Sequence, residues 1–318
     1  MLRYALTRLA LLALGLVAAS AIIFVSLRVL PGDVAQVIAG TSGSPEQVAA
    51  IREGLGLDRP LTAQYLDWAS GIVTGDLGTS YLTGTPVSAE LADKAAVTVP
   101  LGAMSLAVAL AMALPFGVIS ALRRRSWGGQ AIGFAAQGLA AVPVVWAGMM
   151  LVAVFAVALG WLPAQGFPTR TGWSTPWQAF ESLILPAVTI GVVEGAVLLR
   201  FVRSATLQAV GADFVRAAAA KGLTKTGALL RHGLPSVGLS VVTVLGLQIA
   251  GIIVGAVVIE QVFNLPGIGR MLVADVGARD LEKVQGELLA LTGFVLVTGF
   301  IVDLVHRAVD PRQREEAR

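Results

Sequence analysis

The sequence predicts an all-α integral membrane protein with six transmembrane helices, on the evidence of its composition and of how its apolar residues are arranged. Hydrophobic residues make up 56% of the 318 residues and charged residues only 14%, whereas soluble domains carry roughly 25% charged residues. The mean hydropathy is +0.78. The apolar residues come in uninterrupted runs, and about 20 helical residues cross a hydrocarbon core of about 30 Å. A soluble globular domain is therefore excluded as the fold class.

Six apolar runs define the expected spans. The first follows two arginines, contains no charged residue and is 19 residues long. A secretory signal has an apolar core of about 7–15 residues, so we expect a retained helix here, with a cleaved signal as the alternative. The third run contains Pro143, which membrane helices tolerate because neighbouring helices satisfy the freed backbone groups. The expected spans are 9–27, 95–122, 132–159, 183 onward with Glu194 inside it, 235–259, and 288–305 with Asp303 inside it.

The basic residues predict the orientation of these spans. Fifteen of the 23 lysines and arginines fall on one side if the N-terminus is cytoplasmic, and cytoplasmic segments carry the excess of basic residues. We therefore expect both termini in the cytoplasm. The expected outer segments are 31–94, about 160–182 and about 261–287, and the first of them is expected to form a small ordered cap. The expected domains are 1–94 (first helix and outer cap), 95–312 (five-helix core with the loop 201–234) and 313–318 (cytoplasmic tail).

Several kinds of chemistry are missing from the sequence. It contains no Gly-x-x-x-x-Gly-Lys-Ser/Thr loop, so we expect this chain not to hydrolyse ATP by the usual phosphate cradle. There are no cysteines and only two histidines, His232 and His306, so we expect no thiol catalysis, no metal site and no cofactor in this chain. The net charge of +3 does not suggest nucleic acid as a partner. We therefore expect a protein that is not itself an enzyme.

The most informative segment lies in the longest predicted cytoplasmic loop, 201–234. Asp213 can cap a short helix over 214–221 by accepting a backbone N–H bond. Gly222 is placed to end this helix in a left-handed conformation. The spacing i, i+3, i+4, i+7 puts Phe214, Ala217, Ala218 and Lys221 on one face. Such a helix either presents a shallow contact surface to a cytosolic partner or lies on the lipid surface, and the residues alone do not decide between the two.

This loop resembles the coupling loop of binding-protein-dependent ABC importer permeases. The pattern of that family is Glu-Ala-Ala, three residues, Gly, nine residues, Ile, one residue, Leu-Pro. When the two are aligned on Gly222, Arg216 takes the place of the glutamate and His232 the place of the isoleucine. The peptide and nickel branch of the family commonly departs at the first of these positions, so the assignment survives. The resemblance implies that a short cytoplasmic helix couples to the ATPase through Asp213, Phe214, Arg216, Ala217, Ala218, Lys221 and Gly222.

Other stretches are similar to the B-type permease of the dipeptide and oligopeptide importers. Their order and spacing, from about residue 1 to 312, carry the resemblance more than any single piece does. The segment after the fifth span, with Asn264, Pro266 and Gly267, is expected to contact a solute-binding protein. The remaining matches are Leu30-Pro31-Gly32-Asp33, the segments 55–61, 64–65 and 75–80, Glu260, Phe263, Ile268-Gly269, Asp303 and Asp310-Pro311-Arg312.

The resemblance implies one transmembrane subunit of an ATP-driven importer of short peptides in the bacterial plasma (inner) membrane. The expected partners are a second homologous permease, two ATPase subunits or one fused pair, an extracytoplasmic solute-binding protein and the surrounding lipid. ATP and Mg²⁺ would be bound by the ATPase subunits. A nickel or metal-chelate permease shares these motifs and is the alternative. A stand-alone secondary transporter, which would show inverted repeats or paired broken helices, is disfavoured.

One charged residue in the spans is a candidate for the substrate pathway. Glu194 lies near the middle of the fourth span, where a charge costs at least about 2.5–3.5 kcal/mol and therefore faces the bundle interior or a water-filled path. It either lines the pathway or pairs with a basic group of a partner helix. The pairs Gly191 with Gly195 and Gly251 with Gly255 are expected to allow close helix packing.

Overall fold

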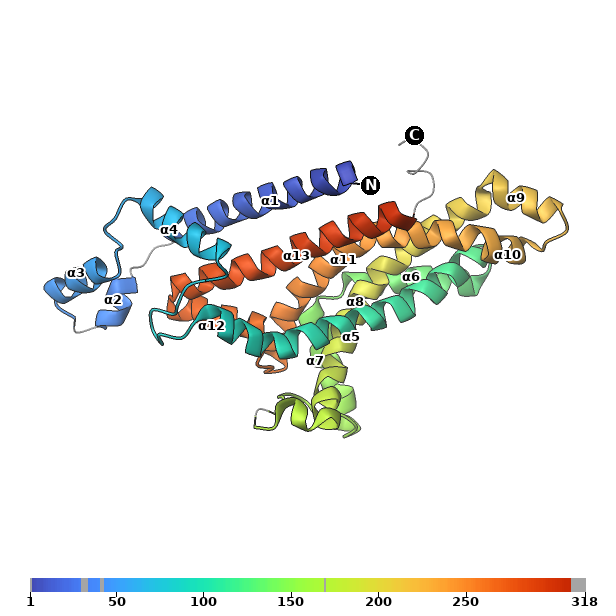
Figure 1. The fold of residues 1–318 in the computed structure, drawn as a ribbon. Helices are drawn as coiled ribbons and strands as arrows, with labels where there is room; N and C mark the ends of the chain where they lie inside the picture. The colour runs from blue at the N-terminus through green and yellow to red at the C-terminus, as the bar shows by residue number, and fades with distance from the viewer. Residues whose placement is uncertain (1, 30–33, 41–42, 169, 310–318) are drawn as a thin grey trace. The chain divides into compact units, whose positions relative to one another are not determined.

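The computed structural model describes residues 2–29, 34–40, 43–168 and 170–309. Every regular element in these residues is a helix, and the one β-type pairing among them is an isolated bridge between Thr79 and Pro86. Figure 1 shows the order of the helices. The chain divides into two compact units, one of Met1–Thr98 with Pro266–Val297 and one of Val99–Leu265 with Thr298–Arg318. The predicted all-α membrane fold is confirmed, and each unit is described by itself below.

The first unit contains the predicted cap. Helix α3 (Pro45–Gly54) in this cap has its start fixed by a capping box, in which Gln47 N donates to Ser44 Oγ (3.3 Å) and Ser44 N donates to Gln47 Oε1 (3.0 Å). Phe24, Trp68 and Leu289 form a buried cluster. The helices of this unit are α1 (Leu2–Val29), α2 (Val34–Ala39), α3 (Pro45–Gly54), α4 (Leu61–Val73), the first part of α5 (Val87–Leu122), α12 (Ile268–Ala278) and the first part of α13 (Leu281–Val309).

The second unit is built around one long, buried helix. α8 (Pro176–Gly211) packs against α6, α7 and α11, and 67% of the residues in its most apolar 18-residue stretch are buried. The core around it includes Leu198, Val202, Leu229 and Val241. The other elements of this unit are the rest of α5, α6 (Trp127–Ala141), α7 (Val144–Leu151), the π-helical turn η1 (Val152–Ala158), the 3₁₀ turn η2 (Gly172–Ser174), α9 (Asp213–Ala220), α10 (Lys225–Ala228), the π-helical turn η3 (Leu229–Gly233), α11 (Leu234–Val262) and the end of α13.

The predicted spans match helices in the described residues, with one break. Five helices are long and apolar enough to cross a membrane, and α6 with the α7–η1 helix makes a sixth span if the bent pair is counted as one. The two halves of this pair are bent by 103°. Pro143 has no N–H to donate and pushes Val142 into an extended conformation (φ −75°, ψ 127°). The third span is therefore broken at Pro143, where the sequence had predicted one continuous helix.

The helices extend beyond the apolar runs. α8 begins at Pro176, before the predicted start at 183, and continues to Gly211 inside the predicted loop 201–234. α13 begins at Leu281, before the predicted start at 288. The apolar pattern ends at the first charged residue, but nothing in the helix backbone requires it to end there. At 1.5 Å per residue, the 36 residues of α8 span about 54 Å.

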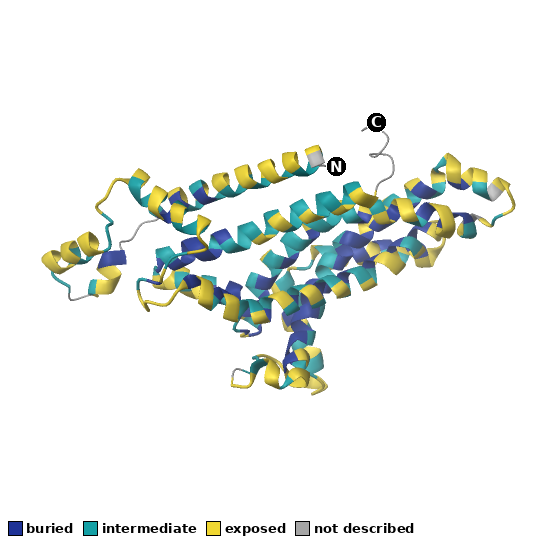
Figure 2. Cartoon of the chain, viewed as in Figure 1, coloured by how far each residue is buried: buried dark blue, intermediate teal, exposed yellow. Residues whose placement is uncertain are grey.

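The exposed surface of α1 is largely apolar. Figure 2 shows α1 exposed along much of its length, and its exposed side chains include Leu14, Val17 and Ile22. Only 11% of the residues in the most apolar 18-residue stretch of α1 are buried. Apolar side chains that other helices do not cover suit a hydrocarbon environment, in which the helix satisfies its own backbone groups.

Candidate functional site

The predicted coupling helix is α9, which lies between α8 and α10 and contacts both of them and η3. The helix begins at Asp213, so the position before its first residue is occupied by Ala212, whose carbonyl accepts from Val215 N (3.2 Å) and Arg216 N (3.1 Å). The carboxylate of Asp213 accepts from Arg216 Nη2 at 2.7 Å. Asp213 was predicted to cap this helix. In the structure it is the first helical residue, and its carboxylate pairs with Arg216, one turn further along.

The two faces of α9 differ in exposure. Val215 is buried at 4% exposure and lies against the position of Gly233. On the predicted outward face, Phe214 is 42% exposed, Ala217 and Lys221 are exposed, and Ala218 is half-buried. The ring of Phe214 is thus an apolar surface that the rest of the chain covers only in part. The structure therefore brings the predicted coupling residues together on one accessible segment.

The end of α9 is set by Gly222. The helix ends at Ala220, and Gly222 has φ = +101°, as predicted. A Cβ at this position would meet nothing within 4 Å. A side chain here would therefore cost only conformational energy, because L-residues are disfavoured at positive φ.

Glu194 has a partner within its own unit. Gln248 Nε2, on α11, donates to Glu194 Oε2 (2.6 Å) and to the backbone carbonyl of Glu194 (2.8 Å). Gly251, one turn further along α11, makes room for the carboxylate, since a Cβ there would lie 2.8 Å from Glu194 Oε1. Sequence reasoning missed Gln248, because an amide in an apolar run carries no signal of its partner.

The four glycines predicted to allow close packing do so within the second unit. A Cβ on Gly191 would lie 2.7 Å from the carbonyl oxygen of Ser105 on α5, and one on Gly195 would lie 3.0 Å from Cα of Ala109. Gly255 is less crowded, with Ile190 Cγ2 at 3.3 Å from its Cβ position. The backbones of α5 and α8 therefore approach too closely for any larger residue.

The predicted docking residues follow the end of α11. Asn264 is exposed and has φ = +54°, while Pro266 is half-buried and Gly267 is buried. The division between the two units falls directly after Leu265. Within the second unit, Gly166 N donates to the carbonyl of Phe263 at 2.7 Å. Of the three predicted residues, Asn264 is thus the one whose side chain is open to a partner.

The first unit contains a buried ionic cluster that sequence reasoning missed. Lys283 Nζ lies 2.6 Å from Glu90 Oε2 and 3.0 Å from Asp275 Oδ2, and the lysine side chain is 7% exposed. The carboxylate of Asp280 accepts from the Ser80 hydroxyl and from Tyr81 N (3.2 Å). The only signal in the sequence is the cluster of charges over 280–287, which lies in the expected outer segment 261–287.

No metal centre is apparent in the described part of the chain: no group there of three or more histidine, cysteine, aspartate or glutamate side chains could hold a metal ion. His232 is exposed and His306 is half-buried.

Comparison with known proteins identifies the class that this fold and loop define. Residues 113–315 match the family model "Binding-protein-dependent transport system inner membrane component", and residues 1–102 match the model of its N-terminal region. The chain belongs to this family of ABC transporter permeases, and it is a multi-pass inner-membrane protein.

Individual relatives cover nearly the whole chain. It is 38% identical over 293 residues to the probable peptide ABC transporter permease protein y4tP of Sinorhizobium fredii, an alignment that covers 92% of this chain and 93% of the relative. It is 35% identical over 315 residues to the glutathione transport system permease protein GsiC of Salmonella typhi and to that of Escherichia coli, covering 99% of each chain.

Proposed function

We propose that this chain is the permease subunit of an importer that takes up short peptides delivered by a solute-binding protein. The relatives named for peptide and glutathione transport, aligned over 92–99% of the chain, carry this proposal. Glutathione is itself a short peptide. A nickel or metal-chelate cargo would be supported by metal-binding side chains, which the described residues do not group together.

The partners follow from the family. A binding-protein-dependent permease works with a solute-binding protein and an ATPase, and the arrangement proposed is a second homologous permease with two ATPase subunits or one fused pair. ATP and Mg²⁺ would bind to those ATPase subunits, and this chain would have no ATPase site or cofactor of its own. Rigid-body rocking of the two permeases would then alternate access to the pathway.

Within this chain, α9 would be the element that contacts the ATPase. Phe214, Ala217 and Lys221 are exposed on it, and Gly222 sets the direction of the chain that leaves it. Ala218 and the ion pair between Asp213 and Arg216 would complete the contact surface. The loop would be cytoplasmic together with both termini.

Glu194 would line the pathway and meet the amino group of a peptide. The side-chain hydrogen bond from Gln248 goes to Oε2, so Oε1 would be the oxygen that meets the ammonium group. The segment of Asn264, Pro266 and Gly267 would dock the solute-binding protein, chiefly through the exposed Asn264. The domains would be the first helix with an extracytoplasmic cap (1–94), the core (95–312) and the tail (313–318).

The direct test is uptake of radiolabelled dialanine by the complete transporter, reconstituted with its solute-binding protein and ATPase in liposomes. We expect ATP-dependent accumulation of the dipeptide and none of radioactive nickel. Nickel accumulation without peptide uptake would contradict the proposed cargo.

Coupling is tested in the same assay with Gly222→Val. We expect uptake to be lost while the ATPase subunits still co-purify, because a β-branched residue at φ = +101° redirects the chain behind α9. The matched control is Gly238→Val, where a helical glycine faces open space and uptake should persist. Normal uptake by Gly222→Val would remove α9 from the coupling role.

Orientation is tested by single-cysteine labelling, since the chain has no native cysteine. Arg125→Cys should react with a membrane-impermeant maleimide only after the cells are broken, and Arg52→Cys should react in intact cells. The opposite result would reverse the proposed topology.

A further inference from the structure

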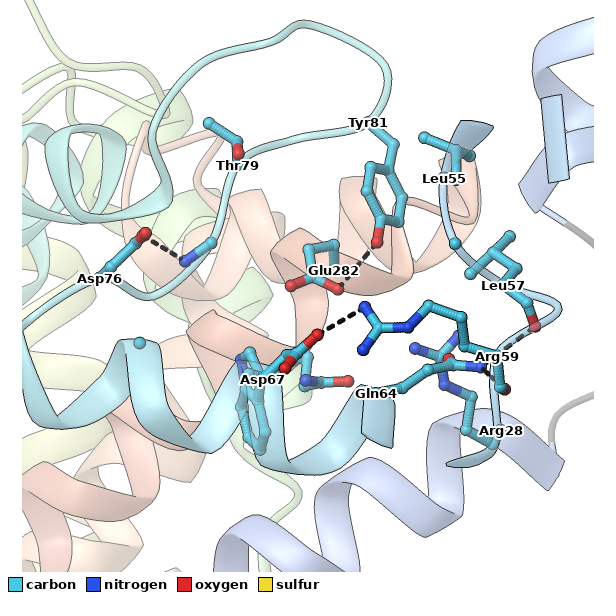
Figure 3. A pocket seen from close by; sticks show the side chains of 15 residues that line it. Arg28, Leu55, Leu57, Arg59, Gln64, Asp67, Asp76, Thr79, Tyr81 and Glu282 are labelled. Atoms are coloured by element: carbon cyan, nitrogen blue, oxygen red, sulfur yellow. Dashed lines mark hydrogen bonds and ion pairs between the residues drawn. The ribbon is translucent and has the colours of Figure 1, made fainter. Parts of the chain in front are cut away.

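Two acidic side chains near the start of α13, Glu282 and Glu287, have different surroundings. Glu282 faces a polar cavity of about 290 Å³, whose wall also includes Arg28. The carboxylate of Glu282 accepts from the hydroxyl of Tyr81 at 3.3 Å (Figure 3). Glu287 does not line this cavity and is 0% exposed. Any partner of the Glu287 carboxyl group must therefore lie in the interior of the first unit.

The carboxyl group of Glu287 meets another acceptor instead of a donor. Neither of its oxygens receives a hydrogen bond in the described part of the chain, and Asp275 Oδ2 on α12 is a third buried acceptor of this kind. The side chains of Glu287 and Asp275 lie within hydrogen-bonding distance of each other. Buried acceptors are nearly always paired, but two ionised carboxylates have no hydrogen to donate. A proton on one of the two carboxyl groups would turn this contact into a hydrogen bond.

The charges around Glu287 also favour a bound proton. The charged groups that face it are Asp275 on α12, Glu90 on α5 and Lys283 on α13. One ammonium group therefore faces three carboxyl groups, and the fully ionised cluster would carry two negative charges in excess. Uncompensated charge is costly to bury, and one bound proton removes half of this excess.

The position of Lys283 determines which carboxyl group holds this proton. Its Nζ lies 2.6 Å from Glu90 Oε2 and 3.0 Å from Asp275 Oδ2, so the cation stabilises both groups as carboxylates. The side chain of Glu90 is also 28% exposed and accepts from the hydroxyl of Thr85. The side chain of Asp275 is 16% exposed. Glu287 is the most buried of the three and accepts from no donor, so it is the group that stays neutral.

We propose that Glu287 is a proton-binding site, whose protonated carboxyl group donates a hydrogen bond to the carboxylate of Asp275 at neutral pH. The ligand is a proton and not a metal ion, because the ammonium group of Lys283 already occupies the position between Glu90 and Asp275. All four residues belong to one compact unit. The site depends neither on the proposed cargo nor on the proposed orientation in the membrane.

This proton links the stability of the first unit to pH. Its loss would leave two negative charges in contact, one on α12 and one on α13, and these helices would then repel each other. In the unfolded chain a glutamate loses its proton near its ordinary pKa of about 4.3. The folded chain keeps the proton of Glu287 above that pH and so binds one proton more than the unfolded chain. Stability therefore falls as the pH rises, until the folded chain also releases the proton.

The proton can be detected by infrared spectroscopy of the full-length chain in lipid nanodiscs, because a protonated carboxyl group has a C=O stretching band that a carboxylate lacks. At about pH 7, where an exposed glutamate is ionised, we expect Glu287→Gln to remove one such band. The matched control Glu53→Gln, which changes an exposed acid of α3 in the same unit, should remove none. An unchanged band in Glu287→Gln would show that Glu287 is ionised and would overturn the proposal.

A second measurement is the pH dependence of SDS-induced unfolding. Between about pH 5.5 and about pH 7.5, the unfolding equilibrium constant of wild type should rise about tenfold per pH unit relative to that of Glu287→Gln, because one proton distinguishes the two. Glu53→Gln should keep the pH dependence of wild type. Parallel curves for wild type and Glu287→Gln would contradict the proposal. Failure of Glu287→Gln to fold would do the same, since an amide reproduces the shape and the donor of a protonated carboxyl group.

Discussion

The two units of this permease hold distant parts of the sequence together by different means. In the first unit, residues about 200 positions apart are joined by buried polar contacts, such as Lys283 with Glu90 and Ser80 with Asp280. In the second unit, α8 and its neighbours meet chiefly through apolar side chains and glycines, and Gln248 on α11 donates to Glu194 on α8. Specific polar pairs therefore hold the first unit together, and close packing of apolar surfaces holds the second.

This difference predicts how each unit responds to mutation. A buried charge that loses its partner remains uncompensated, whatever the shape of the replacement. An apolar helix contact tolerates chemical change but not added volume, because the interior is close-packed. Three substitutions separate these two responses, from the largest expected effect on stability to the smallest.

The largest effect is expected for Lys283→Met. Methionine matches the length of the lysine but leaves Glu90 and Asp275 without the cation that both contact. Breaking a buried pair in this way costs about 3–5 kcal/mol, measured as the shift in the midpoint of SDS-induced unfolding. The double variant Lys283→Met with Glu90→Gln should recover part of this loss. A midpoint within error of wild type in the single variant would show that the cluster does not stabilise the unit.

A smaller effect is expected for Gly191→Ala. The added methyl group would lie 2.6 Å from Cβ of Val108 and 2.7 Å from the carbonyl oxygen of Ser105, so α5 and α8 must separate. Overpacking of this kind costs about 1–3 kcal/mol. The control Gly238→Ala adds the same methyl group where nothing lies within 4 Å, and it should be neutral or slightly stabilising. If both variants unfold at the same point, close approach of the helices is not what the glycine provides.

The smallest effect is expected for Arg216→Ala. The ion pair of Arg216 with Asp213 is 2.7 Å long, close to the 2.6 Å between Lys283 and Glu90, but its side chains are 70% and 97% exposed. Exposed pairs contribute about 0–1 kcal/mol, so the unfolding midpoint should barely move. A loss comparable to that of Lys283→Met would mean that burial does not control the strength of these pairs.

The membrane fold could be predicted from sequence because its signal is local. Each span is an apolar run, and Gly222 was predicted to end a helix because it follows a short amphipathic segment. The bend at Pro143 was not predicted, since proline only removes a hydrogen bond and the neighbouring helices decide whether the chain then turns by 103°. Helix ends were misplaced for a similar reason, because charge marks the end of an apolar run and not the end of a helix.

The contacts between distant residues could not be predicted in the same way. Nothing local connects Glu194 with Gln248, or Lys283 with Glu90, because these pairs depend on how the helices pack. The polar cavity around Arg28 is a stronger case, since its walls come from five separate segments of the chain. Its residues each look like ordinary loop or helix-end residues in the sequence.

The length of α8 has a mechanical consequence. This helix is a continuous rod that carries Glu194 near its middle and ends two residues before α9 begins. A rod of about 54 Å that pivots by about 5° at one end sweeps the other end through about 5 Å, slightly less than the rise of one helical turn. A small displacement of α9 would therefore move α8 as one rigid body. The displacement at Glu194 would depend on how far that residue lies from the pivot.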